Sequence, residues 1–141
     1  MKVRTFAGIS LVAAAGIIAM PTLKATPAKS PVQASRITFL EPTRVCGHFL
    51  MGDYVVVHDD LKMARGEPCT TFYQLKRDKT EPVLSFHCIP RQRDVVAQTT
   101  IRIVPADGVT TMTRWRKLVE YQIGGDSEAH GVPEFDVHEG R

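Results

Sequence analysis

The sequence contains no hydrophobic run long enough to cross a lipid bilayer comfortably. Its longest apolar run, Phe6–Met20, has 15 residues and ends at Pro21. A membrane-spanning helix needs about 20 predominantly apolar residues. We therefore expect no transmembrane span in the mature protein.

Several functional signatures are also missing. The 141 residues contain no glycine-rich phosphate loop, no Cys-x-x-Cys pair, no haem-attachment motif and no long repeat. With 43% hydrophobic and 23% charged residues, the composition is that of an ordinary globular domain. The absence of a catalytic signature favours a protein that is not an enzyme.

The N-terminal segment has the features of a secretory signal peptide. Lys2 and Arg4 precede the apolar run, and small residues at Ala25 and Ala28 offer two cleavage sites. An uncleaved N-terminal anchor is the alternative. A signal peptide predicts export to the periplasm or to the cell exterior.

Composition divides the rest of the chain. Prolines and small residues before residue 36 indicate a flexible lead-in, and acidic residues gather near the C-terminus. The predicted organisation is a signal peptide over 1–25, a lead-in over 26–35, a β domain over 36–123 and a solvated acidic tail over 124–141.

The excess of basic residues is small and belongs to the predicted signal peptide. The full chain has 18 Lys and Arg against 15 Asp and Glu. Removal of residues 1–25 takes away three basic residues and leaves a formal charge of zero. Nucleic-acid affinity comes chiefly from phosphate neutralisation by Lys and Arg. We therefore expect no nucleic-acid partner, and the partner is an unidentified protein or small ligand.

After residue 35 the chain consists of short β-rich runs separated by turn residues. One helical turn is expected at Leu61–Arg65, capped by Asp59 or Asp60 and ended by Gly66. The pattern predicts an all-β fold, a small antiparallel sandwich or partly open barrel of six to seven strands. The expected strands are Arg36–Leu40, Val45–Leu50, Tyr54–His58, Thr70–Leu75, Val83–Ile89, Val95–Val104 and Val109–Ile123.

Three cysteines in an exported protein predict one disulfide and one remaining thiol. If the expected strands Thr70–Leu75 and Val83–Ile89 form a hairpin, Cys69 lies opposite or beside Cys88. Closing this loop of about 18 residues adds roughly 3 kcal/mol to stability. Cys46 is then the free thiol, although either pairing with Cys46 remains open.

Four segments resemble those of small secreted bacterial proteins without an assigned activity. These segments are His58–Met63, Gly66–Cys69, Phe86–Cys88 and Ala129–Pro133, and the resemblance spans roughly residues 46 to 133. It implies an exported bacterial protein, and it implies no cofactor or catalytic residue.

Histidine, methionine and cysteine side chains suggest an alternative function, a copper or zinc site. Imidazole together with thiolate or thioether favours these metals. The candidate ligands are His58, Met63 and His87 at predicted strand ends and loops, with Cys88 or Cys46 as the thiolate. The spacing of these residues matches no established metal motif. Without a metal, His58 is a loop-anchoring side chain and His87 a packed strand residue.

Weaker candidates complete the set. A loop after His58 offers polar groups for binding, namely Asp59, Asp60, Lys62, Arg65 and Glu67. An outward cluster of Arg102, Arg114 and Arg116 is a possible anion patch, or else a solvated sheet face. Cys46 with His48 is a nucleophile-like pair that lacks an identifiable third residue. Our main prediction is a non-catalytic binding or structural module that needs no cofactor.

Overall fold

The computed structural model describes residues 28–76, 80–106 and 115–135, and strands dominate them. The predicted all-β fold is confirmed. One short helix, α1, covers Asp60–Ala64, and Asp59 caps it by accepting hydrogen bonds from Leu61 N and Lys62 N. The strands are β1 (Val32–Val45), β2 (His48–Asp59), β3 (Thr70–Leu75), β4 (Thr80–Phe86), β5 (Ile89–Gln92), β6 (Thr100–Pro105), β7 (Arg116–Gln122) and β8 (Glu128–Gly131).

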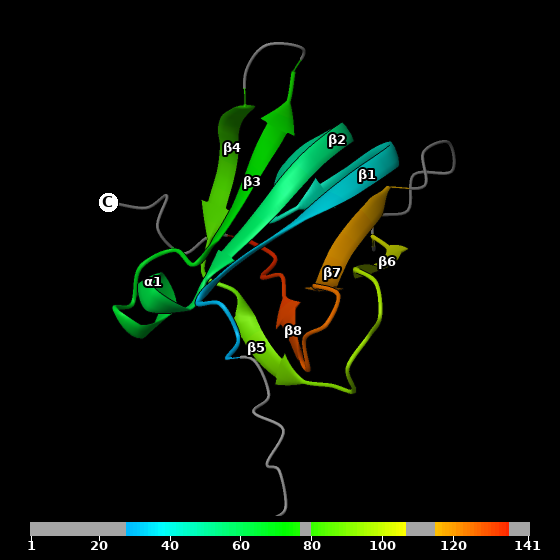
Figure 1. The fold of residues 1–141 in the computed structure, drawn as a ribbon. Coiled ribbons are helices and arrows are strands. Elements are labelled where there is room, and N and C mark those ends of the chain that lie inside the picture. Colours follow the sequence, from blue (N-terminus) through cyan, green and yellow to red (C-terminus); the bar gives the residue numbers. More distant parts are fainter. Residues whose placement is uncertain (1–27, 77–79, 107–114, 136–141) are drawn as a thin grey trace, which may run out of the picture.

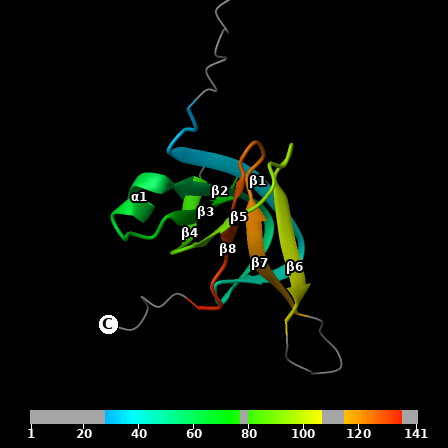
Figure 2. The same ribbon diagram turned by 90° about the horizontal axis from the view of Figure 1, so that it is seen from below.

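The eight strands belong to one curled sheet that forms a half-barrel (Figures 1 and 2). The strand order is β4-β3-β2-β1-β7-β8-β5, and β6 pairs with β7. β1 and β7 are parallel, and all other pairs are antiparallel. The sheet is thus mixed and has more strands than predicted. The parallel pair forms because β1 is long: its last residues, beyond an irregularity after Phe39, reach β7.

Alternation along the strands directs one set of side chains into the half-barrel. In β2, Tyr54, Val56 and His58 are buried at every second position, as expected for a strand with one buried face. Phe72 of β3 lies at the centre of an aromatic cluster, in contact with Phe39, Tyr54, Phe86 and Tyr121. The core therefore fills the concave side of the sheet.

The hairpin of β3 and β4 has a different register from the one that the sequence suggests. Simple alternation pairs Thr71 with Phe86, whereas the structure pairs Thr70 with Phe86 and Thr71 with Ser85. An irregularity after Phe72 shifts the remaining pairs. A β-bulge inserts an extra residue in one strand, and such a residue reverses the alternation beyond it.

The N-terminal boundary of the domain differs from the expected one. β1 begins at Val32, inside the segment expected to be a flexible lead-in. The Lys29 ammonium lies 2.8 Å from the Asp126 carboxylate, and Asp60 N donates to Pro31 O. These contacts fix the chain before β1 against α1 and against the segment that precedes β8. The predicted signal peptide, including the possible cleavage site at Ala25, lies outside the described residues, whereas Ala28 lies within them.

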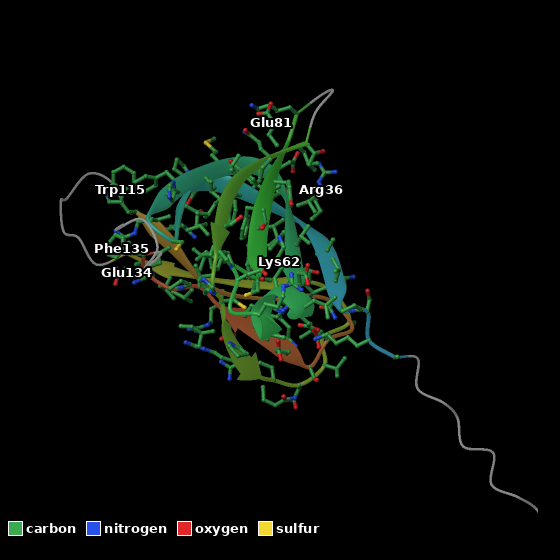
Figure 3. All side chains as sticks on the ribbon, turned by 90° about the vertical axis from the view of Figure 1, so that its left-hand side faces the viewer. Arg36, Lys62, Glu81, Trp115, Glu134 and Phe135 are labelled. Atoms are coloured by element: carbon green, nitrogen blue, oxygen red, sulfur yellow. The ribbon has the colours of Figure 1, made fainter. Side chains whose placement is uncertain are left out.

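Part of the predicted acidic tail folds onto the body. β8 lies within it, and Asp126 is buried. Glu134 accepts a hydrogen bond of 2.8 Å from Arg44, whose guanidinium also stacks over the Phe135 ring. Figure 3 shows Glu134 and Phe135 on the same side of the molecule as Trp115. The expectation of a solvated tail is therefore wrong for Asp126 and for β8, whereas Glu134 binds Arg44 but remains 54% exposed. No helix in the described ranges is long and apolar enough to span a membrane.

The outer face of β7 carries an ion cluster instead of an open anion patch. Arg91, Arg93 and Arg102 lie 3.2, 3.0 and 3.8 Å from the Glu120 carboxylate, which is only 11% exposed. Arg116 pairs with Glu41 at 2.6 Å. Two members of the predicted patch, Arg102 and Arg116, are therefore matched by carboxylates, and Arg114 lies outside the described residues.

Replacing Glu120 with Gln is expected to lower the free energy of unfolding by about 1–2 kcal/mol at pH 7. The hydrogen bond from Arg93 and the surrounding guanidinium charges hold the pKa of Glu120 below its usual value, against the opposing effect of burial. A carboxyl with a lowered folded-state pKa stabilises the fold above its unfolded-state pKa, and this contribution disappears as the pH falls through the folded-state pKa. Urea titrations at several pH values test this.

The difference between wild type and Glu120→Gln should therefore shrink on acidification below the usual carboxyl range. Glu41→Gln is the matched control, because Glu41 is 60% exposed and binds a single arginine. We expect this variant to change stability by less than about 0.5 kcal/mol. An equal loss in both variants would contradict a special role for Glu120.

Candidate metal centre

Four side chains that can bind a metal meet at one end of the half-barrel, where β2, β3 and β8 approach the segment that joins β4 to β5 (Figure 1). They are His58, Cys69, Cys88 and His130, and all four are buried. The exposed fraction is 0% for both histidines and at most 8% for the cysteines. They come from positions that are distant in sequence, so only the folded chain brings them together.

Strand alternation places three of these side chains in the interior. His58 follows Tyr54 and Val56 on the inward face of β2, and Cys88 continues the buried positions Leu84 and Phe86 beyond the end of β4. His130 faces inward because it pairs with the buried Tyr121.

Cys69 and Thr70 anchor the start of β3 beside these groups. Asp59 N donates to Cys69 O at 2.9 Å, which closes the segment that contains α1. His58 pairs with Thr70 across β2 and β3, and the hydroxyl groups of Thr70 and Tyr121 form a hydrogen bond of 2.6 Å. These bonds connect β3 to β7 across the interior and hold the four candidate ligands in one place.

The sulfur of Cys88 lies at the centre of the cluster. It is 3.7 Å from His58 Nδ1, 3.6 Å from His130 Nδ1 and 3.1 Å from Cys69 Sγ. The ligand atoms of His58, Cys69 and Cys88 all lie within 4.8 Å of one another. The same holds for His58, Glu128 and His130. The two groups share His58, and Cys88 Sγ lies 3.6 Å from His130 Nδ1, so the groups are adjacent.

These separations fit a tetrahedral ion of the size of zinc. Zinc binds sulfur at about 2.3 Å and imidazole nitrogen at about 2.0–2.1 Å, which places sulfur and nitrogen ligands about 3.6 Å apart and two sulfurs about 3.8 Å apart. Both measured sulfur-to-nitrogen distances agree with this geometry. The two sulfurs, 3.1 Å apart, would have to separate further to bind one ion.

The predicted disulfide between Cys69 and Cys88 is not present. The two sulfurs lie 3.1 Å apart and both residues are free thiols, whereas an S–S bond is about 2.05 Å long. The structure does bring these two cysteines together. Cys46 lies before the start of β2 and His58 near its end, which is a span of about 40 Å along an extended strand. Cys46 is therefore too far away to pair with Cys69 or Cys88.

A carboxylate orients the first histidine. His58 Nε2 lies 2.8 Å from Asp60 Oδ1. When Nε2–H donates to this carboxylate, the lone pair of Nδ1 points toward the sulfurs. Metal-binding histidines usually donate their second N–H to a carboxylate or carbonyl, which fixes the tautomer and the ring orientation.

The second histidine is held by ring packing. Its ring centroid lies 4.0 Å from that of His58 and 4.9 Å from that of Tyr121. His130 Nε2 is buried and has no hydrogen-bond partner, and Nδ1 lies 3.7 Å from the Glu128 carboxylate. A buried ring nitrogen without a hydrogen-bond partner is rare, because an unsatisfied group costs about 1–3 kcal/mol. The other ring nitrogen, Nδ1, faces Cys88 Sγ at 3.6 Å and is the atom available to a metal.

The environment sets the protonation of the cluster. The hydrogen bond with Cys88 and the proximity of His58 outweigh burial and lower the pKa of Cys69 to about 4. The same hydrogen bond and burial raise the pKa of Cys88. Burial, together with the charge of His58, lowers the pKa of His130 to about 4. At neutral pH the cluster thus contains a thiolate and a neutral imidazole, which are the forms that bind metals.

Burial also lowers the pKa of His58, but the hydrogen bonds and charges of neighbouring groups raise it by more. Burial favours the neutral ring, whereas the hydrogen bonds with Cys69 and Asp60 favour the protonated ring and raise the pKa of His58. The interaction between His58 and Cys69 therefore favours the charged form of each side chain. A divalent ion that displaces the proton of His58 would keep a positive charge beside this thiolate.

The sequence identified part of this centre. The structure brings His58 and Cys88, two of the predicted candidate ligands, into one group with Cys69, whereas Cys46 is not part of it. His87 is half-buried and belongs to neither group of ligand atoms, and Met63 packs against the hydrophobic core. Adjacent residues such as His87 and Cys88 point in different directions in extended chain, so only one of them faces the cluster.

The predicted binding loop is mostly structural. Asp59 caps α1, Asp60 binds His58, and Arg65 forms an ion pair with Glu67 at 2.6 Å. Lys62 lies on α1, on the face of the molecule shown in Figure 3. The two members of the nucleophile-like pair differ in exposure: Cys46 is buried, whereas His48 is exposed.

His130 is the ligand that sequence reasoning missed. It lies in a four-residue strand inside a segment whose acidic residues suggested a solvated tail. The alternation of Glu128 and His130 around Ala129, followed by Gly131 and Val132, is the only local signal of a strand there. So short a pattern does not by itself predict a strand; the strand is defined by its pairing with β7.

Comparison of the chain with protein-family models, curated proteins and solved structures finds no match.

Proposed function

We propose that this chain is a zinc-binding β domain in which His58, Cys69, Cys88 and His130 hold one structural zinc ion. The observation that carries this proposal is the convergence of four buried nitrogen and sulfur ligands, with sulfur-to-nitrogen distances of 3.6 and 3.7 Å. A ligand set of two thiolates and two imidazoles favours zinc over metals that prefer oxygen ligands.

A structural role fits better than a catalytic one. Four protein ligands complete the coordination of zinc, whereas catalytic sites keep one position open for water or substrate. The four ligands are buried, so substrate has no direct route to the ion. We therefore keep the prediction of a non-catalytic binding or structural module, exported from a bacterial cell, and add zinc as its cofactor.

Metal analysis of the purified, reduced full chain tests this proposal. We expect one zinc ion per chain by mass spectrometry of the native protein and by elemental analysis. Replacement by Co²⁺ should produce the visible absorption of tetrahedral cobalt together with sulfur-to-cobalt charge transfer. Copper in place of zinc would overturn the choice of metal, and a reduced protein without any bound metal would overturn the site.

Variants of single ligands locate the ion. Cys69→Ser and His130→Ala should each weaken zinc binding by roughly a hundredfold or more, since each removes one of four bonds that together supply about 10–16 kcal/mol. Cys46→Ser and His48→Ala are the matched controls, because these residues lie at the opposite end of β2. Loss of zinc in the controls would contradict the assignment of the ligands.

Asp60→Ala is expected to weaken zinc binding by about 10- to 100-fold, the usual effect of removing a group that orients a metal ligand. The cause is loss of the 2.8 Å bond to His58 Nε2, which leaves the tautomer and ring angle of His58 unfixed. Competition with a chromogenic zinc chelator measures the affinity. Glu67→Ala, which removes an exposed carboxylate from the same segment, should leave the affinity unchanged.

A further inference from the structure

We propose that the cysteine pair of the zinc centre is also a redox site: oxidation of Cys69 and Cys88 to a disulfide and binding of zinc exclude each other. This inference rests on the proposed zinc function. It extends that function by assigning a covalent modification to the same two sulfurs and by naming its chemical trigger, a peroxide.

The position of the two sulfurs supports both states. Their separation of 3.1 Å lies between the disulfide bond length of about 2.05 Å and the spacing of about 3.8 Å between two sulfurs on a tetrahedral zinc ion. Cys88 N donates to Cys69 Sγ at 3.3 Å, so the backbone of one cysteine already contacts the sulfur of the other. Small movements in either direction therefore reach either state.

The two states cannot coexist on one chain. Zinc binds cysteine through the thiolate, and a sulfur that forms a disulfide is no longer a thiolate. Oxidation leaves His58 and His130 as the remaining strong ligands, beside the carboxylate of Glu128. This set lacks both sulfurs and is not a closed structural zinc site. Disulfide formation is thus expected to release the ion.

Peroxide is the oxidant that fits this environment. Both sulfurs are at least nine-tenths buried, so a small molecule of nearly the size of water reaches them more readily than a bulky disulfide. One thiolate attacks a peroxide oxygen, an S–O bond forms, the O–O bond breaks and hydroxide leaves. The second thiolate then attacks the resulting sulfenic acid, the S–S bond forms and a second hydroxide leaves.

The sum of these steps balances. Two thiolates lose two electrons, hydrogen peroxide gains them, and two protons convert the two hydroxides to water. The neighbouring sulfur at 3.1 Å traps the sulfenic acid, which protects it from irreversible further oxidation. A thiol reductant reverses the change and regenerates the zinc ligands.

The third cysteine provides an internal reference. Cys46 is buried in the turn between β1 and β2, at the far end of β2 from the zinc centre. It should stay a thiol when the other two cysteines are oxidised, and intermolecular pairing through Cys46 is disfavoured by its burial. A count of remaining thiols therefore reports on the pair alone.

The experiment uses the reduced full chain loaded with zinc and exposed to hydrogen peroxide. A chromogenic chelator records zinc release, while intact mass, thiol counting after unfolding and peptide mapping record the oxidation state. We expect one zinc ion to be released for each Cys69–Cys88 disulfide, with a mass decrease of two hydrogen atoms and one thiol left. Dithiothreitol should restore zinc binding.

The outcomes separate this inference from the proposed function. Zinc content before oxidation decides the zinc site by itself, and a reduced chain that binds no zinc overturns both. If zinc binds, a disulfide form that retains it overturns the inference alone, and so does zinc release accompanied only by sulfinic or sulfonic acids. Cys46→Ser should behave as wild type with no thiol left, whereas Cys69→Ser should form no internal disulfide.

Discussion

Zinc is expected to raise the melting temperature of the reduced chain by roughly 15 °C when free zinc exceeds its dissociation constant a thousandfold. A ligand that binds only the folded state adds RT ln(1 + [L]/Kd), which is about 4.1 kcal/mol at this excess. In a domain of this size, 1 kcal/mol corresponds to a few degrees. Differential scanning fluorimetry at several free zinc concentrations measures the shift.

The physical reason is that the ligands belong to separate parts of the sheet. His58 lies in β2, Cys69 before β3, Cys88 after β4 and His130 in β8. An ion bound to all four would connect β8 to β2, β3 and β4, with which β8 forms no strand pair in the described part of the chain. Unfolding would break these bonds together.

Chelation should reverse the shift, and His130→Ala should abolish it without a comparable loss in the absence of zinc. A variant that melted at the wild-type temperature with zinc would contradict coordination by His130. Peroxide-treated wild type is a second comparison, because oxidation should remove the response to zinc while the disulfide itself stabilises the chain. A lower melting temperature with zinc would indicate binding to the unfolded cysteines and histidines instead.

The sequence predicted the class of the fold because alternation is a local property. The strand Thr70–Leu75 has the predicted bounds, and the helical turn near Leu61 begins after Asp59 as its capping chemistry suggests. The parallel pairing of β1 with β7 joins residues more than seventy positions apart. Nothing in either segment alone specifies that contact.

The candidate metal centre could be predicted only in part for a related reason. Periodicity placed Cys69 near Cys88, because both flank one hairpin. Recognition of His130 required knowledge that β8 pairs with β7 and that Tyr121 faces inward. The acidic residues around His130 predicted a solvated segment instead, since acidic residues usually face water. Lys29 and Arg44 overcome that tendency by pairing with Asp126 and Glu134.

Phe72→Ala is expected to cost about 3–5 kcal/mol, the range for removing a large buried aromatic side chain. Phe72 is fully buried, and its ring lies 6.2–6.4 Å from those of Phe39, Tyr54, Phe86 and Tyr121. Typical domains have a free energy of unfolding of about 5–15 kcal/mol. This single change therefore removes a large share of the stability, as urea titration should show.

Phe49→Ala is the matched control, because Phe49 is 53% exposed and contacts Trp115 on the surface. We expect it to cost about 1 kcal/mol or less. Similar losses in the two variants would contradict a core centred on Phe72.

The Phe72→Ala variant also tests whether the proposed zinc centre depends on the aromatic core. Phe72 contacts Tyr121, and the Tyr121 ring packs on His130, so the aromatic core and the proposed zinc centre share a side chain. If the core only supports the fold, zinc should stabilise Phe72→Ala and wild type by the same free energy, as expected for independent sites. If the core positions His130 through Tyr121, zinc should stabilise the variant less. Zinc-dependent urea titrations of both proteins distinguish these two results and show how far the metal centre depends on the packing beneath it.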